Sequence, residues 1–216
     1  MTLAFIYCMM RTVVYIDGFN FYYRAVKNTP YKWLDFKSLF QKLLSKQNKI
    51  ISIKYFTALV SGKYDHYKPI RQETYIRALK AYIPEIEIYY GHFLTHEIFA
   101  PLAKPKKKQK SIKIIKTEEK GSDVNLAVQL LNDAWLNFFD CAVIVSNDSD
   151  LAEGLHLVKN YHPRKKIGLI MPGKGHPSKE LMKYSDFVKR IRSGVLKSSL
   201  LPDPIPGTNL YKPKSW

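Results

Sequence analysis

Short runs of β-branched and apolar residues alternate with helical patterns, and this alternation constrains the fold of the chain more than any other feature. Residues 12–16 (TVVYI), 142–146 (AVIVS) and 166–171 (KIGLIM) have the length and composition of buried strands. Apolar residues at helical spacing occupy the intervals between such runs. Strands alternating with helices of this length predict an α/β fold, with a mainly parallel central sheet flanked by helices on both faces.

The remaining elements follow from the same patterns. Asp35 is a suitable N-cap for the helix that begins after it. Further strands are expected at residues 50–60, 86–90 and 186–191, and helices at residues 36–44, 69–82, 124–138 and 151–160.

A chain of 216 residues is long enough for one domain with a substantial core. We expect an N-terminal extension at residues 1–10 and a domain at 11–197. Within it, residues 94–120 interrupt the alternation as a basic insertion, of which SIKII is a short strand or hairpin arm. Residues 198–216 are rich in proline, which predicts an extended or disordered tail.

Acidic residues mark three turns of the predicted fold. Asp17 follows residues 12–16 directly, in the segment DGFN that also carries Asn20. Asp148 and Asp150 follow residues 142–146 in SNDSD, and Asp123 opens the predicted helix in KGSDVNLAVQLL. Each aspartate also suits a helix N-cap, and Asp150 in particular is a candidate cap for the helix near Leu151.

Two observations favour a metal site over capping alone. The carboxyl ends of parallel strands meet at one edge of a sheet, which is where open α/β folds bind their ligands. Carboxylates gathered there repel one another unless a cation neutralises them, and hard oxygen ligands suit Mg²⁺ or Mn²⁺. The sequence therefore predicts an acidic pocket for a divalent metal.

The three segments YIDGFNFYY, KGSDVNLAVQLL and VIVSNDSDL, in this order, resemble the signature blocks of the NYN domain family, the LabA-like branch of the PIN-like nuclease superfamily. The resemblance extends over about residues 11–192. The third block departs from the usual SGDSDF, since Asn147 replaces glycine and Leu151 replaces phenylalanine, but both acidic positions remain.

The resemblance implies a PIN-like fold and a metal-dependent ribonuclease. It carries over Asp17, Asp123, Asp148 and Asp150 as catalytic, metal-binding residues and Asn20 as an associated polar residue. In the expected reaction, water activated by one or two Mg²⁺ or Mn²⁺ ions hydrolyses an RNA phosphodiester bond.

The charge of the chain favours a polyanionic partner. Lys and Arg number 35 against 18 Asp and Glu, a formal charge of +17, which predicts attraction to RNA, single-stranded or structured. A lysine-rich, solvated surface without a partner is the alternative. The candidate RNA-binding residues are Lys104, Lys106, Lys107, Lys108, Lys110, Lys113, Lys116, Lys120 and Arg24.

Two other functions remain open from the residues. A non-catalytic RNA-binding or regulatory module can keep the same fold, although the intact acidic residues argue against it. A phosphatase-like enzyme also begins with a strand followed by aspartate, but it commonly has a second aspartate two residues later, where this chain has Phe19.

The setting of the protein is only broadly constrained. Two cysteines, Cys8 and Cys141, are too few for a disulfide scaffold and favour a reducing, cytoplasmic location. The first ten residues read poorly as a signal peptide, and no apolar run reaches the ~20 residues of a membrane span. The sequence leaves a homo-oligomer open.

Overall fold

A computed structural model describes residues 9–63, 65–106 and 109–216. Its centre is a six-stranded sheet in the order β3-β2-β1-β6-β7-β8, in which every neighbouring pair is parallel. The strands are β1 (Met10–Asp17), β2 (Asn48–Thr57), β3 (Ile86–Tyr90), β6 (Cys141–Val145), β7 (Lys166–Met171) and β8 (Phe187–Arg190). The strand order reverses between β1 and β6, so the sheet is doubly wound about that point.

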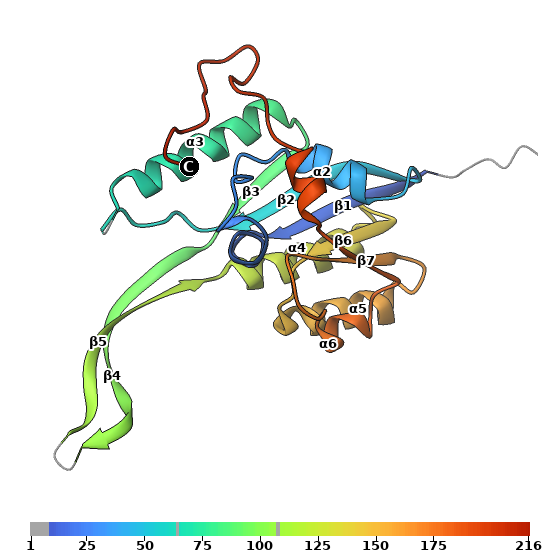
Figure 1. Ribbon diagram of the computed structural model, residues 1–216. Helices are drawn as coiled ribbons and strands as arrows, with labels where there is room; N and C mark the ends of the chain where they lie inside the picture. Colours follow the sequence, from blue (N-terminus) through green and yellow to red (C-terminus); the bar gives the residue numbers. More distant parts are fainter. Residues whose placement is uncertain (1–8, 64, 107–108) are drawn as a thin grey trace, which may run out of the picture.

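Helices cover both faces of the sheet, as the alternation of strands and helices predicts (Figure 1). Val14 and Ile16 of β1 point to one face, while Val13 and Tyr15 point to the other, because successive strand residues alternate. The first face packs against α2 (Phe36–Leu43), α3 (Tyr67–Tyr82) and α7 (Ser193–Lys197). The second packs against α4 (Ser122–Trp135), α5 (Ala152–Tyr161) and α6 (Lys179–Met182).

Several element ends differ from the sequence-based expectation. The strand expected to run to residue 60 ends at Thr57, and the helix expected to run to residue 138 ends at Trp135. Two short helices follow β1 in succession, α1 (Gly18–Phe21) and a π-helix (Tyr22–Val26), and a 3-10 helix (Ser149–Leu151) lies in the turn after β6. None of the helices in the described ranges is long and apolar enough to cross a membrane.

The basic insertion is a long antiparallel hairpin rather than one short strand. Strands β4 (His92–Lys106) and β5 (Gln109–Lys120) pair from His92 with Lys120 outwards. Figure 1 shows this arm projecting away from the sheet, with only its base close to the domain.

A buried polar network fixes α4 against the sheet. Asp133 of α4 accepts hydrogen bonds from the Tyr15 hydroxyl at 2.6 Å and from Lys54 Nζ at 2.9 Å. Lys54 also donates to Gln129 Oε1 at 3.0 Å. Burial, followed by the charge of Asp133, raises the pKa of Tyr15 well above its ordinary value. These bonds set the position of the helix whose first turn carries Asp123.

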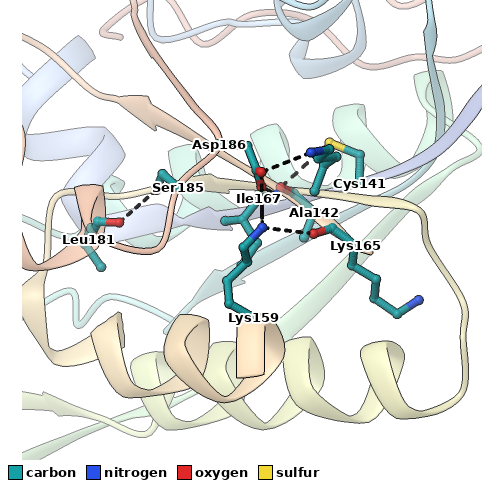
Figure 2. Close-up of polar contacts among 9 residues, drawn as sticks. Cys141, Ala142, Lys159, Lys165, Ile167, Leu181, Ser185 and Asp186 are labelled. Carbon is teal, nitrogen blue, oxygen red and sulfur yellow. Dashed lines mark hydrogen bonds and ion pairs between the residues drawn. The ribbon is translucent and has the colours of Figure 1, made fainter. Parts of the chain in front are cut away.

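Asp186, the residue before the edge strand β8, points its carboxylate towards β7 and α5 (Figure 2). Asp186 accepts from Ile167 N at 2.7 Å and from Lys159 Nζ at 2.9 Å. Burial opposes ionisation, but these hydrogen bonds together with Lys166 lower the pKa of Asp186 below its ordinary value. The ionised carboxylate ties the last strand to β7 and α5.

The C-terminal segment does not stand away from the domain. It lacks long regular elements, as expected, but Leu201 and Ile205 are buried in the core. The Trp216 ring lies 6.0 Å from that of Trp33 and 5.3 Å from that of Tyr75, between ring centroids. The segment is rich in proline and has no regular apolar periodicity, so no sequence signal indicated this packing.

Candidate metal centre

Asp17 ends β1 at the point where the strand order reverses. Its Oδ1 accepts from Asn20 N at 2.9 Å, which caps α1, and its Oδ2 accepts from Ser146 Oγ at 2.7 Å. Only 4% of Asp17 is exposed. Burial raises the pKa of Asp17, as does the charge of Asp148, while the two hydrogen bonds oppose the rise. Asp17 thus caps α1 and also lines the acidic pocket.

Gly18 lets the chain leave the strand directly after Asp17. A Cβ at this position would lie 2.5 Å from Phe56 O and 2.9 Å from the Tyr55 ring. A side chain there would push the turn away from β2, so glycine is what allows Asp17 to sit at the sheet edge.

Asp148 reaches the same place from the end of β6. Its backbone N donates to Ser146 Oγ at 3.1 Å, and its Oδ1 accepts from Asp150 N at 3.1 Å. The capping oxygen of the following 3-10 helix therefore belongs to Asp148 and not to Asp150, which is exposed.

Asp123 approaches from the first turn of α4. Gly121 precedes this helix with φ of 94°, a left-handed conformation that glycine adopts without strain. Burial raises the pKa of Asp123 to about 6, followed in effect by the charges of Asp17 and Asp148. The raised pKa of Asp123 thus reflects its burial first and then the negative charges gathered around it.

The structure brings together three of the four predicted carboxylates. One oxygen from each of Asp17, Asp123 and Asp148 lies within 4.8 Å of the others. Asp150 stands outside this triad, although its charge contributes to the raised pKa of Asp123. Three carboxylate donors of this kind fit a hard divalent cation such as Mg²⁺ or Mn²⁺.

Asn20 links the turn after β1 to the turn after β6. Its Oδ1 accepts from Asn147 N at 3.2 Å. Asn147 in turn accepts from Ser178 N at 2.7 Å and donates to His176 O at 3.2 Å. Asn20 therefore holds together the loops that carry Asp17 and Asp148.

The triad lies in an open pocket of about 270 Å³. Its wall also contains Phe19, Tyr23, Phe93 and Glu119, as well as Asn20 and Ser122. Sequence reasoning did not assign Phe19, Phe93 or Glu119 to the pocket. Glu119 accepts from Ser122 N at 3.1 Å and Ser122 Oγ at 2.8 Å, a capping pattern readable in EKGS, whereas Phe93 comes close only because the hairpin closes.

The predicted RNA-binding cations differ in their surroundings. Lys116 and Lys120 both pair with Glu118, and Lys113 pairs with Glu97. Lys104, Lys110 and Arg24 are exposed, and no ion pair of theirs occurs within the described ranges. The side chain of Lys106 and the whole of Lys107 and Lys108 lie outside the described residues.

Comparisons with known proteins agree with this geometry at the level of the fold. A model of the family described as NYN domain matches residues 11–191. The crystal structure of a protein of unknown function, VPA0982 from Vibrio parahaemolyticus RIMD 2210633, is similar with a TM-score of 0.54 and 14% identity, covering 90% of this chain and 98% of that one. At that identity the likeness concerns the fold alone.

Another similar protein is named as a monooxygenase. The 6-hydroxy-3-succinoylpyridine 3-monooxygenase HspA of Pseudomonas putida (strain DSM 28022 / S16) is 35% identical over 236 aligned positions. The alignment spans 96% of this chain and 75% of that protein.

Proposed function

The chain belongs to the NYN domain family, and we propose that it is a ribonuclease that hydrolyses RNA phosphodiester bonds with a divalent cation held by Asp17, Asp123 and Asp148. The observation that carries the proposal is the approach of these three carboxylates within 4.8 Å at the reversal of the strand order. Open α/β sheets bind ligands at this position.

The residues present suit Mg²⁺ or Mn²⁺. Carboxylate oxygens are hard donors, and Mg²⁺ is usually held by few protein carboxylates together with phosphate oxygens of the substrate. When bound, such a cation polarises a phosphodiester and lowers the pKa of water. Ser146 and Asn20 keep the Asp17 carboxylate oriented, so its oxygens are in place before substrate arrives.

Attraction of RNA to an acidic pocket requires positive charge elsewhere. The formal charge of +17 supplies it, and the exposed Lys104 and Lys110 lie on the arm whose base borders the pocket. We include Lys106, Lys107, Lys108 and Arg24 in this phosphate-binding role, with the ion-paired Lys113, Lys116 and Lys120 contributing less. Such contacts give affinity that falls steeply with salt.

The test is cleavage of end-labelled single-stranded and structured RNA by the purified chain with Mg²⁺, with Mn²⁺ or with EDTA. Cleavage that needs metal and disappears in both Asp17→Asn and Asp148→Asn supports the proposal. RNA binding without cleavage by the parent protein under every metal condition would instead favour the non-catalytic RNA-binding module. We also propose that the protein is located in the cytoplasm.

A second candidate function is hydroxylation of an aromatic heterocycle, favoured by the 35% identity to HspA. Aromatic side chains in the pocket wall suit a flat ring. A monooxygenase places one atom of O₂ in the product and reduces the other to water with two electrons, so a donor such as a reduced nicotinamide is required. The turn after β1 reads DGFN, however, and its carboxylate would repel a dinucleotide pyrophosphate, whereas dinucleotide folds place glycines there.

The two candidates are separated by one parallel assay. The chain is incubated with 6-hydroxy-3-succinoylpyridine, a reduced nicotinamide and O₂, and the reaction is followed by oxygen uptake and product mass. Incorporation of one atom of labelled O₂ into a product, with no RNA cleavage in the companion assay, would replace the ribonuclease proposal.

A further inference from the structure

Three aromatic residues help to line the acidic pocket. Phe19 of α1, Tyr23 of the π-helix and Phe93 of β4 line the same cavity as the carboxylate triad. Phe19 and Tyr23 follow Asp17 closely in sequence, whereas Phe93 comes from the base of the hairpin arm. Three elements therefore contribute rings to one small cavity.

The rings are held in defined orientations and remain partly accessible. Phe19 and Phe93 meet edge to face, with centroids 5.6 Å apart and planes at 77°. Both are half-buried, and Tyr23 is 55% exposed, with Lys27 Nζ 4.6 Å from its ring centroid. Exposed aromatic surface inside a concave site favours binding of another flat ring.

The base of the hairpin fixes Phe93 relative to the carboxylates. Gly91 donates its N–H to Thr57 O at 2.8 Å, and Phe93 is paired with Glu119 across the hairpin. Glu119 accepts from Ser122, the residue before Asp123. Phe93 is thus connected to the triad through Glu119 and Ser122. These contacts fix the position of the aromatic ring relative to the carboxylates.

We propose that Phe19, Tyr23 and Phe93 form a stacking site for one unpaired nucleobase next to the triad. This inference rests on the proposed ribonuclease function and adds a substrate class to it. A base in a duplex is stacked on both faces and cannot turn one face to a protein ring without leaving the helix. The site therefore selects a single-stranded nucleotide beside the bond that is cut.

The test uses RNA carrying 2-aminopurine at single positions, because stacking on an aromatic side chain quenches the fluorescence of this base. Binding is measured with variants that also carry Asp148→Asn, because loss of this triad carboxylate should leave the bound RNA uncleaved. Phe93→Ala should raise the Kd for single-stranded RNA by about 10- to 100-fold and abolish the quench, as expected for loss of base stacking. Phe93→Tyr should restore both.

Phe99→Ala is the matched control, because Phe99 lies on the same strand and the same side of it but is 72% exposed further along the arm. It should change Kd less than threefold, about the effect of a typical exposed position. Thermal melting checks that each variant is folded.

Equal binding and quench in Phe93→Ala and Phe99→Ala would overturn the stacking site. Preference for duplex over single-stranded RNA would also overturn it. If the stacking site exists but the ribonuclease proposal fails, 2-aminopurine fluorescence is quenched on binding to the parent chain, yet no RNA is cleaved with either metal.

Discussion

The Ser146 hydroxyl donates to Asp17 Oδ2 at 2.7 Å and accepts from Asp148 N at 3.1 Å. One fully buried side chain therefore connects the ends of two adjacent parallel strands and touches two residues of the triad. This hydroxyl therefore fixes the Asp17 carboxylate relative to the backbone of Asp148.

Ser146→Ala should lower the affinity for Mn²⁺ by about 10- to 100-fold, the usual effect of removing a group that orients a metal ligand. The Asp17 carboxylate loses one of its two hydrogen bonds and gains freedom to rotate. Isothermal titration with Mn²⁺ measures the change. Ser149→Ala, at an exposed neighbouring position, is the control and should bind as the parent does.

Asp148→Asn and Asp150→Asn should behave differently. Loss of a triad carboxylate should reduce RNA cleavage about 100-fold or more, as for other groups that stabilise charge in the transition state. Asp150 is exposed and outside the triad, so Asp150→Asn should lower the rate of RNA cleavage by less than about fivefold. Single-turnover cleavage rates give the comparison, and equal losses in both variants would place Asp150 among the ligands after all.

The triad should make the metal-free protein less stable as pH rises. The folded pKa of Asp123 is about 6 and its ordinary value is 3.8, so the folded state binds more protons between these values. Its contribution to the free energy of unfolding therefore falls from about pH 4 to about pH 6. Urea unfolding in EDTA across this range tests the sign, and Asp123→Asn should show a weaker decline.

Metal affinity should change in the opposite direction and increase as pH rises. Ligands must be deprotonated, so Mn²⁺ affinity should drop as the solution is acidified below about pH 6, by at most about tenfold per unit for one competing proton. Titrations at several pH values measure this. Affinity that is constant down to pH 4.5, about 1.5 units below that pKa, would exclude Asp123 as a ligand.

Asp133→Ala should be among the most destabilising substitutions, because it leaves Lys54 buried without its partner. The Lys54 and Asp133 side chains are 5% and 6% exposed. Breaking such a pair costs about 3–5 kcal/mol, whereas the pair of Arg11 and Asp140 is exposed to solvent, which screens it, and contributes much less. Urea unfolding of Asp133→Ala and Asp140→Ala should therefore give clearly different losses.

Gly91→Ala should destabilise the base of the arm, by about 1–3 kcal/mol for an overpacked position. Its Cβ would lie 2.3 Å from Glu119 Oε1 and 2.6 Å from Lys120 O. Gly194→Ala is the control, since a Cβ there meets nothing within 4 Å and alanine suits the helix α7. Melting temperatures that fall equally in both variants would contradict the close approach.

The parts of this fold that depend on local pattern were predictable from sequence. Residues 12–16 and 142–146 are apolar without alternation, which indicates strands buried on both faces, and the acidic turns after them point to one sheet edge. The parallel sheet, the helices on both faces and the family resemblance were confirmed.

Other features depend on contacts between distant segments and left little trace in the sequence. Phe93 enters the pocket because the hairpin closes opposite Glu119, a pairing that periodicity does not encode. Asp148 and Asp150 both suit a cap by composition, and only the backbone of the turn decides that Asp148 caps and faces the triad. The packing of Trp216 on Trp33 likewise requires the folded sheet.

The two ends of the arm meet at a pair of glycines, since a Cβ at Gly121 would have Gly91 Cα as its nearest neighbour, 3.9 Å away. The chain leaves the sheet and returns to it at nearly the same place, and the six-stranded sheet is complete without the arm. The hairpin is therefore a modular part. Of the described residues of the arm, only Phe93 and Glu119 at its base line the acidic pocket, so its outer length can be shortened or lengthened while that pocket keeps its shape.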